Sequence, residues 1–568
     1  MLFRSFLLNR ISGIVGSLTT LAMVMLFTIS LAAQQPAPEP APELPVFKKI
    51  DVAQIFDATT EAVLALPETK RKRRESIIRR NLSFAKARVY EILRGGSGLN
   101  DIYVIEEETD EGEPKETPIT NQQLLNGWYR NYHFALMTQT DNMGDIDLQR
   151  LKFIKELTTV CSANNIHSHI VDQIVIPQMK AFLQENYHPA VKYNAMLIIG
   201  QLNGQVVITN AGRSVPVPLP AALTLMVDAI QSGTETDAIL LASWIGVLRH
   251  VRLNRINQQI AVNDIVTIAG EAMKLLNQVA PPATRSAGGQ IWLQRRAIDV
   301  LAMIGEDDKK ILPKILSIMQ DEQAAMSLRL TAARALKYFN YSPSTQVSVE
   351  LTSNALGVLI VRICRNEIDR VDQEKTLAVL QDASGVSSGE GGMGGMEGGM
   401  EGGMEGGMGG MEGGMGGMGG MGGMGGMDGG TEVASMLEPK EKRLVDYTRR
   451  ILVYQLFHVY EAIGEKQVRT TSPPPIGMYA AVVQDAAGQE ALERIDKAMK
   501  KLIVILRIPE SDDEPKKPVA EPNRDTLLES IAKEIRQLES FVVPVETTPE
   551  TVTADAPAAG AVDALPGS

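Results

Sequence analysis

Three short segments in the middle of the chain share one spacing of apolar residues. In each, an apolar residue is followed by Ala at +4, an aliphatic residue at +8 and an apolar residue at +11. This spacing predicts a helix with one buried stripe and a small residue where a neighbouring helix comes closest. The three segments are 191–202, 293–304 and 328–339.

These segments recur at a period typical of helical hairpins. The second and third begin 35 residues apart, and the first begins about three such periods earlier. A hairpin cannot bury its apolar stripe alone, so we expect neighbouring hairpins to stack along 144–383. Further amphipathic stretches supply the partner helices. They are Leu148–Val160, Ile170–Leu183, Leu223–Ile230, Ile260–Leu276, Ile311–Met319 and Leu351–Ile363.

The start of each stripe carries a further pattern. Val191-Lys192, Arg295-Arg296-Ala297 and Leu328-Arg329 are placed like the apolar-Arg-x-x-Ala core of a second repeat helix. In this the chain resembles the HEAT-repeat or armadillo-like α-solenoid family. The resemblance implies a mostly α fold, an α-α superhelix, whose inner groove binds proteins and which rarely carries catalysis. Irregular spacing near Trp244 and Pro-rich insertions depart from the family pattern, so the number of repeats stays open.

The N-terminus has the pattern of an export signal. Arg4 and Arg10 precede the uncharged stretch Ile11–Ala33, which ends in small residues suited to cleavage. We therefore predict a signal peptide at 1–33 and a location in the periplasm or cell envelope. The alternative is an uncleaved membrane anchor, because the stretch is about long enough to span a bilayer. A Pro-rich spacer follows at 34–45.

Residues 46–143 are expected to form a mostly helical module. Within it Ile102–Ile105 predicts a single strand, and the acidic, Pro-containing run Glu106–Pro118 predicts a loop. A basic block at 70–74 is interpreted as a solvated helix face, with contact to anionic lipid or an acidic partner as the alternative. An aromatic group is interpreted as a packed knot at the first repeat, with a binding groove as the alternative. It consists of Trp128, Tyr129, Tyr132 and Phe134.

A Gly/Met low-complexity tract at 384–430 interrupts the helical pattern. A segment of this composition has no apolar core to bury, so we predict a disordered linker. Its expected span is short enough for the helices after it to fold back onto the stack. The C-terminal helical segment, 431–543, shows amphipathic stretches at Leu444–Val459, Ala491–Leu506 and Leu527–Phe541. The apolar stripe expected to be buried in the first consists of Leu444, Tyr447, Ile451, Tyr454, Leu456 and Val459. A disordered tail is predicted at 544–568.

Composition excludes some classes of function. The 568 residues carry a formal net charge of -12, which argues against general nucleic-acid binding because that needs phosphate neutralisation. The two cysteines, Cys161 and Cys364, fall in apolar helical patterns, and we interpret both as small buried residues. One long-range disulfide between them is the alternative.

Two groups of residues are candidate metal ligands. Thioethers prefer Cu(I), so the tract offers a possible copper site, although a plain linker is the favoured interpretation. Its candidate ligands are Met393, Met396, Met400, Met404, Met408, Met411, Met415, Met418, Met421, Met424 and Met427. Three zinc or copper ligands would come from Cys161, His167 and His169. Residues six and eight positions after Cys161 do not lie on the same face of a helix as Cys161, so the segment would need a loop.

No motif in the chain predicts catalysis. The run Gly95–Gly98 lacks the glycine spacing of a nucleophile elbow, and no strand precedes it. We predict a non-catalytic exported scaffold or adaptor, without a cofactor, that binds a protein partner through the helical groove. The alternatives are a periplasmic Cu(I)-handling protein and a cell-envelope structural protein, which would contact the membrane if Ile11–Ala33 is uncleaved.

Overall fold

The computed structural model describes most of the chain between 45 and 542. The described residues are 45–53, 56, 61–108, 114–206, 216–278, 280–283, 285–305, 310–341, 347–383, 439–466, 476–482, 488–507 and 522–542. The predicted signal peptide, the Gly/Met tract with its methionines and the predicted tail lie outside them, as does all of the Pro-rich spacer except Pro45. Where described, the chain is mostly helical, as predicted, and its strands form one two-stranded sheet.

The N-terminal part combines a long helix with a β-hairpin. Its elements are α2 (Glu61–Leu64), α3 (Glu68–Leu93), β1 (Ile102–Glu108), β2 (Pro114–Thr120), α4 (Asn121–Trp128) and α5 (Phe134–Met137). The predicted loop was wrong, because its second half is strand β2, in which Pro118 pairs with Val104. Proline is tolerated here because every strand of a two-stranded sheet is an edge, where a missing N–H leaves no ladder bond unmade. Thr120 then begins α4 through a capping box with Gln123.

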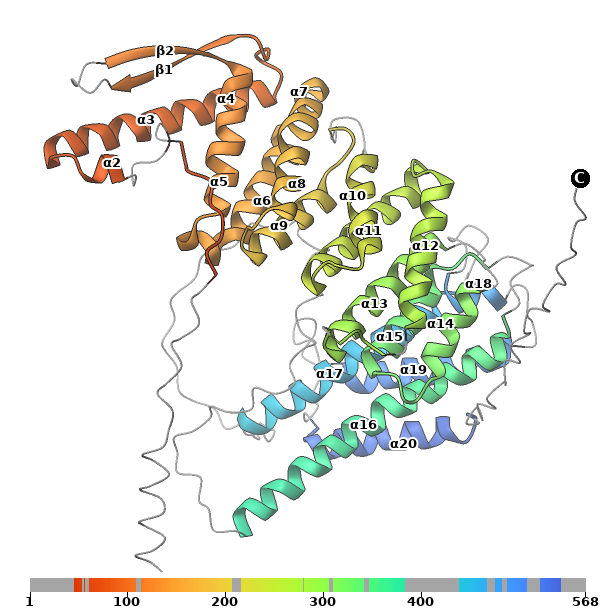
Figure 1. Cartoon of the computed structure of the whole chain (residues 1–568). Helices are drawn as coiled ribbons and strands as arrows, with labels where there is room; N and C mark the ends of the chain where they lie inside the picture. Colours follow the sequence, from red (N-terminus) through yellow and green to blue (C-terminus); the bar gives the residue numbers. More distant parts are fainter. Residues whose placement is uncertain are drawn as a thin grey trace, which may run out of the picture.

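The helices that follow form two layers. Their bounds are α6 (Ile146–Lys155), α7 (Asn164–His169), α8 (Ile176–Gln184), α9 (Pro189–Gln201), α10 (Pro220–Ser232), α11 (Asp237–Asn257), α12 (Val262–Asn277), α13 (Ala287–Ile304), α14 (Ile311–Gln320), α15 (Met326–Ala335), α16 (Val349–Ala383) and α17 (Pro439–Ile463). Helices α9, α11, α13, α15 and α17 pack side by side in that order, and we call them the row. Each row helix also packs on the helix before it in the chain (Figure 1).

The three repeated segments lie in α9, in α13, and in α15 with the short helical turn after it. Their +0, +4 and +8 residues are all buried, which confirms the predicted stripe. A close approach within the row involves Gly200 of α9 and Gly246 of α11. A Cβ atom added at Gly200 would lie 2.7 Å from the Cα of Gly246. Only glycine allows two helix backbones this near, so both positions are determined by packing.

Helix α17 belongs to the same packed body as the helices before the tract. It contacts α15 and α16, and in Figure 1 the end of α16 and the start of α17 both point toward the lower left. The tract therefore connects two helices that pack on each other. The last helices, α18 (Met478–Val482), α19 (Gln489–Leu506) and α20 (Arg524–Glu539), also contact α16. Gly357 makes room for α19, since a Cβ there would meet the side chain of Ile495 at 2.8 Å.

Buried charges join the row helices. The Asp299 carboxylate on α13 accepts hydrogen bonds from Arg296, at 3.1 Å, and from Arg334 on α15, at 2.6 Å. Lys337, just after α15, pairs with Glu461 of α17 at 2.9 Å. The Asp299–Arg334 pair connects α13 to α15. The Lys337–Glu461 pair connects the end of α15 to α17, and the tract lies between these two residues in the sequence.

The first prediction concerns the glycine contact. Gly246→Ala should destabilise the protein by about 1–3 kcal/mol, because its new Cβ would meet Met226 and the Gly200 backbone. Urea unfolding followed by circular dichroism measures the difference. Gly270→Ala in α12 is the matched control: nothing lies within 4 Å of an added Cβ, so stability should rise by about 0.5–1 kcal/mol. Equal effects at both positions would contradict the packing argument.

The second prediction concerns the tract. A protease site inserted within 384–430 should allow complete cleavage without separating the two fragments, because α17 packs directly on α15 and α16. Size-exclusion chromatography after digestion should give one peak that contains both fragments. The same digest in urea should release them. Separation under native conditions would show that α17 is not held by the row.

Candidate interaction surface

Four of the row helices, α11, α13, α15 and α17, keep side chains in contact with solvent. Two of these side chains, both on α17, are exposed, and the others are half-buried. We call this set of side chains the row face. Its members are Leu241 and Ile245 (α11), Trp292 and Arg295 (α13), Arg334 (α15), and Tyr454 and Phe457 (α17).

Polar contacts hold the arginines of this face in place. The Arg295 guanidinium stacks on the Trp292 ring at 4.8 Å and donates to the Thr331 hydroxyl at 3.2 Å. Arg334 donates to Asp299 on the neighbouring helix. Arginine held this way loses little further side-chain freedom on binding a partner. The centre of the row face is therefore preorganised.

His458 links α17 to this centre. It is buried, its ring lies edge-on to Tyr454 at 5.1 Å, and the charges of Arg334 and Arg295 reach it. Burial, reinforced by the Arg334 charge, lowers the pKa of His458 to about 4. The imidazole is consequently neutral at pH 7, and the positive charge at this end of the row face comes from the arginines.

Helix α17 is apolar on two faces, and this corrects its predicted packing. The buried face is formed by Val445, Leu452, Leu456 and Val459. Tyr447 and Tyr454, which the sequence placed in the buried stripe, are 39% and 49% exposed, and Phe457 is 54% exposed. Large exposed aromatic residues beside arginine are typical of protein–protein interfaces.

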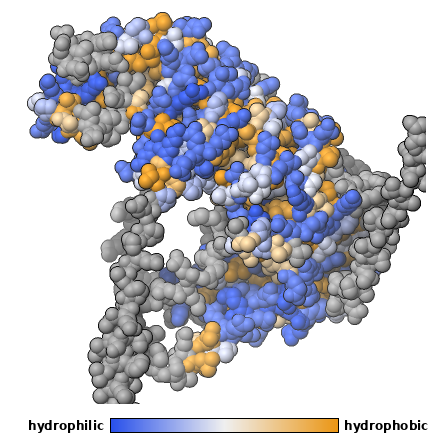
Figure 2. All heavy atoms as spheres, viewed as in Figure 1, coloured by the Kyte–Doolittle hydropathy of each residue, from blue (hydrophilic) through white to orange (hydrophobic). Residues whose placement is uncertain are grey.

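A second exposed apolar group lies at the free end of α16. Leu377, Val379 and Leu380 are each more than half exposed there. Figure 2 shows this group at the lower left, next to atoms drawn in grey. The group contains no arginine or aromatic residue, so it is chemically simpler than the row face.

The predicted aromatic knot is packed. Trp128, Tyr129 and Phe134 are buried, and Phe153 contacts both Tyr129 and Phe134 edge-on, with ring centroids 5.5 and 5.1 Å apart. The structure therefore favours the packing interpretation over a binding groove.

A buried carboxylate inside this knot was not predicted. Glu156 accepts hydrogen bonds from Tyr90, Trp128 and Tyr129 at 3.3–3.4 Å. Burial raises the pKa of Glu156, and these donors oppose the rise. The nearby His133 Nε2 is 3.7 Å from the carboxylate, and burial lowers the pKa of His133 to about 4. Single π-helical turns at 129–133 and 156–160 place both groups. The Glu156 carboxylate is satisfied by its donors, whereas neither ring nitrogen of His133 has a hydrogen-bond partner in the described part of the chain. No sequence pattern pairs residues so far apart.

The predicted cysteine–histidine ligands do not meet as a site. Across the described residues, no three His, Cys, Asp or Glu side chains are placed to hold a metal ion. Cys161 and Cys364 are both free and buried, in agreement with their interpretation as small apolar residues, and the alternative disulfide is absent. Burial raises the pKa of their thiols to about 11 and about 12. Neither thiol is therefore activated as a nucleophile at pH 7.

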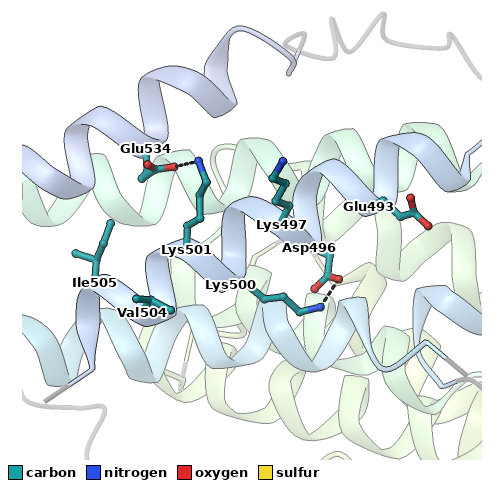
Figure 3. Close-up of a pocket in the computed structure, with 8 residues that line it drawn as sticks. All are labelled: Glu493, Asp496, Lys497, Lys500, Lys501, Val504, Ile505 and Glu534. Carbon is teal, nitrogen blue, oxygen red and sulfur yellow. Dashed lines mark hydrogen bonds and ion pairs between the residues drawn. The ribbon is translucent and has the colours of Figure 1, made fainter. Parts of the chain in front are cut away.

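The larger cavity lies on the C-terminal helices and is electrostatically balanced. Its volume is about 610 Å³. Figure 3 shows the lining residues, which come mainly from α19, with Glu534 contributed by α20. Lys500 pairs with Asp496 at 2.7 Å, and Lys501 pairs with Glu534 at 2.9 Å. Lys497 and Glu493 complete the charged rim. With three cations and three anions around it, the cavity has no selectivity for one sign of charge.

The second cavity is a crevice between α10 and α12. It has a volume of about 270 Å³ and a floor that includes Trp244. Arg285 at its edge is held by Asp237 and Gln290, both at 2.7 Å. These bonds tie the turn before α13 to the start of α11, which is a packing role.

The predicted basic block lies on α3 beside acidic residues. Lys72 pairs with Glu68 at 2.6 Å, and Arg79 lies 3.7 Å from Glu75. These contacts fit a solvated helix face with local charge balance.

Comparison with known proteins adds no relative. No family model, curated protein or solved structure matches this chain. Among the described residues, no helix is both long enough and apolar enough to cross a membrane. The apolar stretch Ile11–Ala33 lies outside them.

The third prediction concerns pH and the buried histidines. Burial lowers the pKa of His250 to about 3 and that of His458 to about 4, so both are neutral when folded but titrate near 6.5 when unfolded. The unfolded state therefore binds protons below pH 6.5 that the folded state does not bind. The free energy of unfolding consequently falls as the pH is lowered from 6.5 toward 4. For one such histidine the loss at pH 5 is about 2 kcal/mol.

Denaturant unfolding of the wild type and of His250→Leu between pH 8 and 5 measures this loss. The variant should lose about 2 kcal/mol less than the wild type over this range. Between pH 8 and 7 the two should run in parallel, which serves as the internal control. Parallel curves down to pH 5 would mean that His250 is protonated in the folded state.

Proposed function

We propose that this chain is a non-catalytic scaffold or adaptor that binds a protein partner along the row face. The proposal takes the stacked hairpins to be an α-solenoid of the HEAT or armadillo type. The observation that carries it is the exposure of Tyr454 and Phe457 on α17, together with the preorganised Arg295 on α13 and Arg334 on α15. Exposed aromatic residues and arginine contribute most to the binding energy of protein interfaces.

The packing of the two layers supports this geometry. On the row side, α9 and α11 meet through Gly200 and Gly246. On the other side, α10 and α12 leave the crevice of about 270 Å³. A stack that packs tightly on one side and loosely on the other curves toward the tight side. In our proposal the row therefore forms the concave side, and the row face lines the groove.

The buried polar groups have packing roles in this proposal. Asp299 holds Arg296 and Arg334, and Glu156 accepts three hydrogen bonds inside the aromatic knot. Neither carboxylate lines the two cavities described above. A carboxylate enclosed by donors orders the core, whereas a catalytic one needs access to a substrate.

The proposed location is the periplasm or cell envelope. It depends on the N-terminal apolar stretch, which lies outside the described residues. Where the structure begins, the chain is tied down: the Lys48 backbone N–H donates to the Asn186 carbonyl at 2.8 Å, and that of Ile50 to the Thr138 hydroxyl at 2.9 Å. Any spacer or anchor before Pro45 would thus emerge near the turn between α8 and α9.

The fourth prediction is the test of this function. Crosslinking mass spectrometry on the native envelope fraction should give crosslinks from one partner that cluster on the row helices. Trp292→Ala should remove them, because truncating a central aromatic residue costs about 2 kcal/mol or more. Val266→Ala on α12, a helix outside the row, is the control and should change nothing. Crosslinks spread evenly, or equally lost in both variants, would refute binding at the row face.

A further inference from the structure

The exposed side of α17 has a regular heptad-like spacing. On the side of α17 opposite its buried face, residues follow steps of four and three, from the exposed Arg443 to Glu461, whose side chain is 15% exposed. The buried face, on Leu452 and Leu456, is already used against the row. The outward stripe consists of Arg443, Tyr447, Arg450, Tyr454, Phe457 and Glu461.

This stripe is complementary to itself when reversed. If two copies of α17 lie antiparallel and cross at the level of Leu452, Arg443 meets Glu461 of the second copy, Tyr447 meets Phe457, and Arg450 meets Tyr454. The contacts are an ion pair, an aromatic pair and a cation–π pair, and two-fold symmetry makes each occur twice.

Neighbouring registers are worse. A crossing at the level of Arg450 places the two Arg450 side chains against each other, and like charges in contact disfavour association. A crossing between Tyr454 and Phe457 leaves Arg443 beyond the end of the partner helix. The pattern of charged and aromatic residues therefore selects one register.

We propose that α17 packs against α17 of a second copy of this chain, antiparallel and centred at Leu452. The inference deepens the proposed function, on which it rests, because it names a partner for the α17 end of the row face. A second copy satisfies both signs of charge in the stripe, whereas an acidic partner would match Arg443 and Arg450 but not Glu461.

The stripe is accessible for such a contact. The start of α17 extends toward the lower left in Figure 1, and Arg443 and Arg450 are exposed along it. Tyr447 is 39% exposed, and Arg370 of α16 lies over its ring at 5.1 Å. Glu461 accepts from Lys337 through Oε1, and its side chain is 15% exposed. In the proposed dimer the partner's Arg443 shares this carboxylate with Lys337. A single helix-on-helix contact is small for an interface, so we expect reversible association.

The test uses two charge reversals in the full chain. Arg443→Glu makes both ends of the stripe acidic, and Glu461→Arg makes both ends basic. Each variant should dimerise at least about tenfold more weakly than the wild type. An equimolar mixture should recover the dimer, because every Glu in one variant then faces an Arg in the other. Sedimentation velocity over a concentration series measures all four samples, and thermal melts show whether each variant is folded.

A second measurement covers the case in which Glu461→Arg does not fold, since it also removes the Lys337 ion pair. Chains carrying Tyr447→Cys, mixed with chains carrying Phe457→Cys, should crosslink through a short bismaleimide, because both native cysteines are buried. Tyr447→Cys chains alone should crosslink far less, and Val266→Cys chains serve as the control for chance collisions.

The outcomes separate the inference from the proposed function. A wild type that stays monomeric at its highest soluble concentration would overturn the α17 pairing. Dimerisation that both charge reversals leave unchanged would overturn it as well. If partner crosslinks in the envelope fraction still depended on Trp292, the scaffold function would stand without the dimer. If the wild type formed the dimer but gave no partner crosslinks that depend on Trp292, the scaffold function alone would be overturned.

Discussion

Burial of one apolar stripe per helix is the constraint on which the rest of this structure depends. Each fully buried Leu or Ile contributes about 1.5–3 kcal/mol, but only if another helix covers it. The two helices of one hairpin cannot cover both of their apolar stripes, so each hairpin stacks on the next. Where α9 and α11 approach each other at Gly200 and Gly246, there is no room for a side chain, so only glycine fits.

The same constraint explains why the chain returns to the row after the Gly/Met tract. Without α17, the open side of α15 would leave its apolar residues in water. Helix α17 packs on that side, and its own buried face includes Val445, Leu452 and Leu456. The Lys337–Glu461 pair then sets the register of α17. Such partly buried ion pairs add little net stability, because desolvation offsets the Coulomb attraction, but they disfavour wrong alignments.

Once the row is complete, the row face is left partly in contact with solvent, and it is most exposed at Tyr454 and Phe457. Its arginines are held by Asp299 and Thr331, and its aromatic residues gather on the last row helix. This explains why α17 is apolar on two sides: one side completes the core, and the other is free for a contact between molecules. An interface at the end of a stack can join two stacks without closing the groove between them.

The helices were largely determined by the sequence itself. Periodicity depends on neighbours three and four residues apart, so the stripes at Val191, Leu293 and Leu328 and the three C-terminal helices were visible without a fold. Strand β2 was missed because its Pro and Glu residues have low strand propensity, and only pairing with β1 stabilises it.

Only the tertiary structure decided which side of a helix faces the core. Helix α17 carries apolar residues all round, so its periodicity predicted the helix but not its buried face, and Tyr447 and Tyr454 were assigned to the wrong side. The contacts of Glu156 and of Asp299 likewise join residues 27 to 66 positions apart, which local spacing does not relate. Hydrogen bonds between residues close in sequence determine where a helix forms. Which of its faces is buried, and which polar side chains meet, depends on the helices that pack against it.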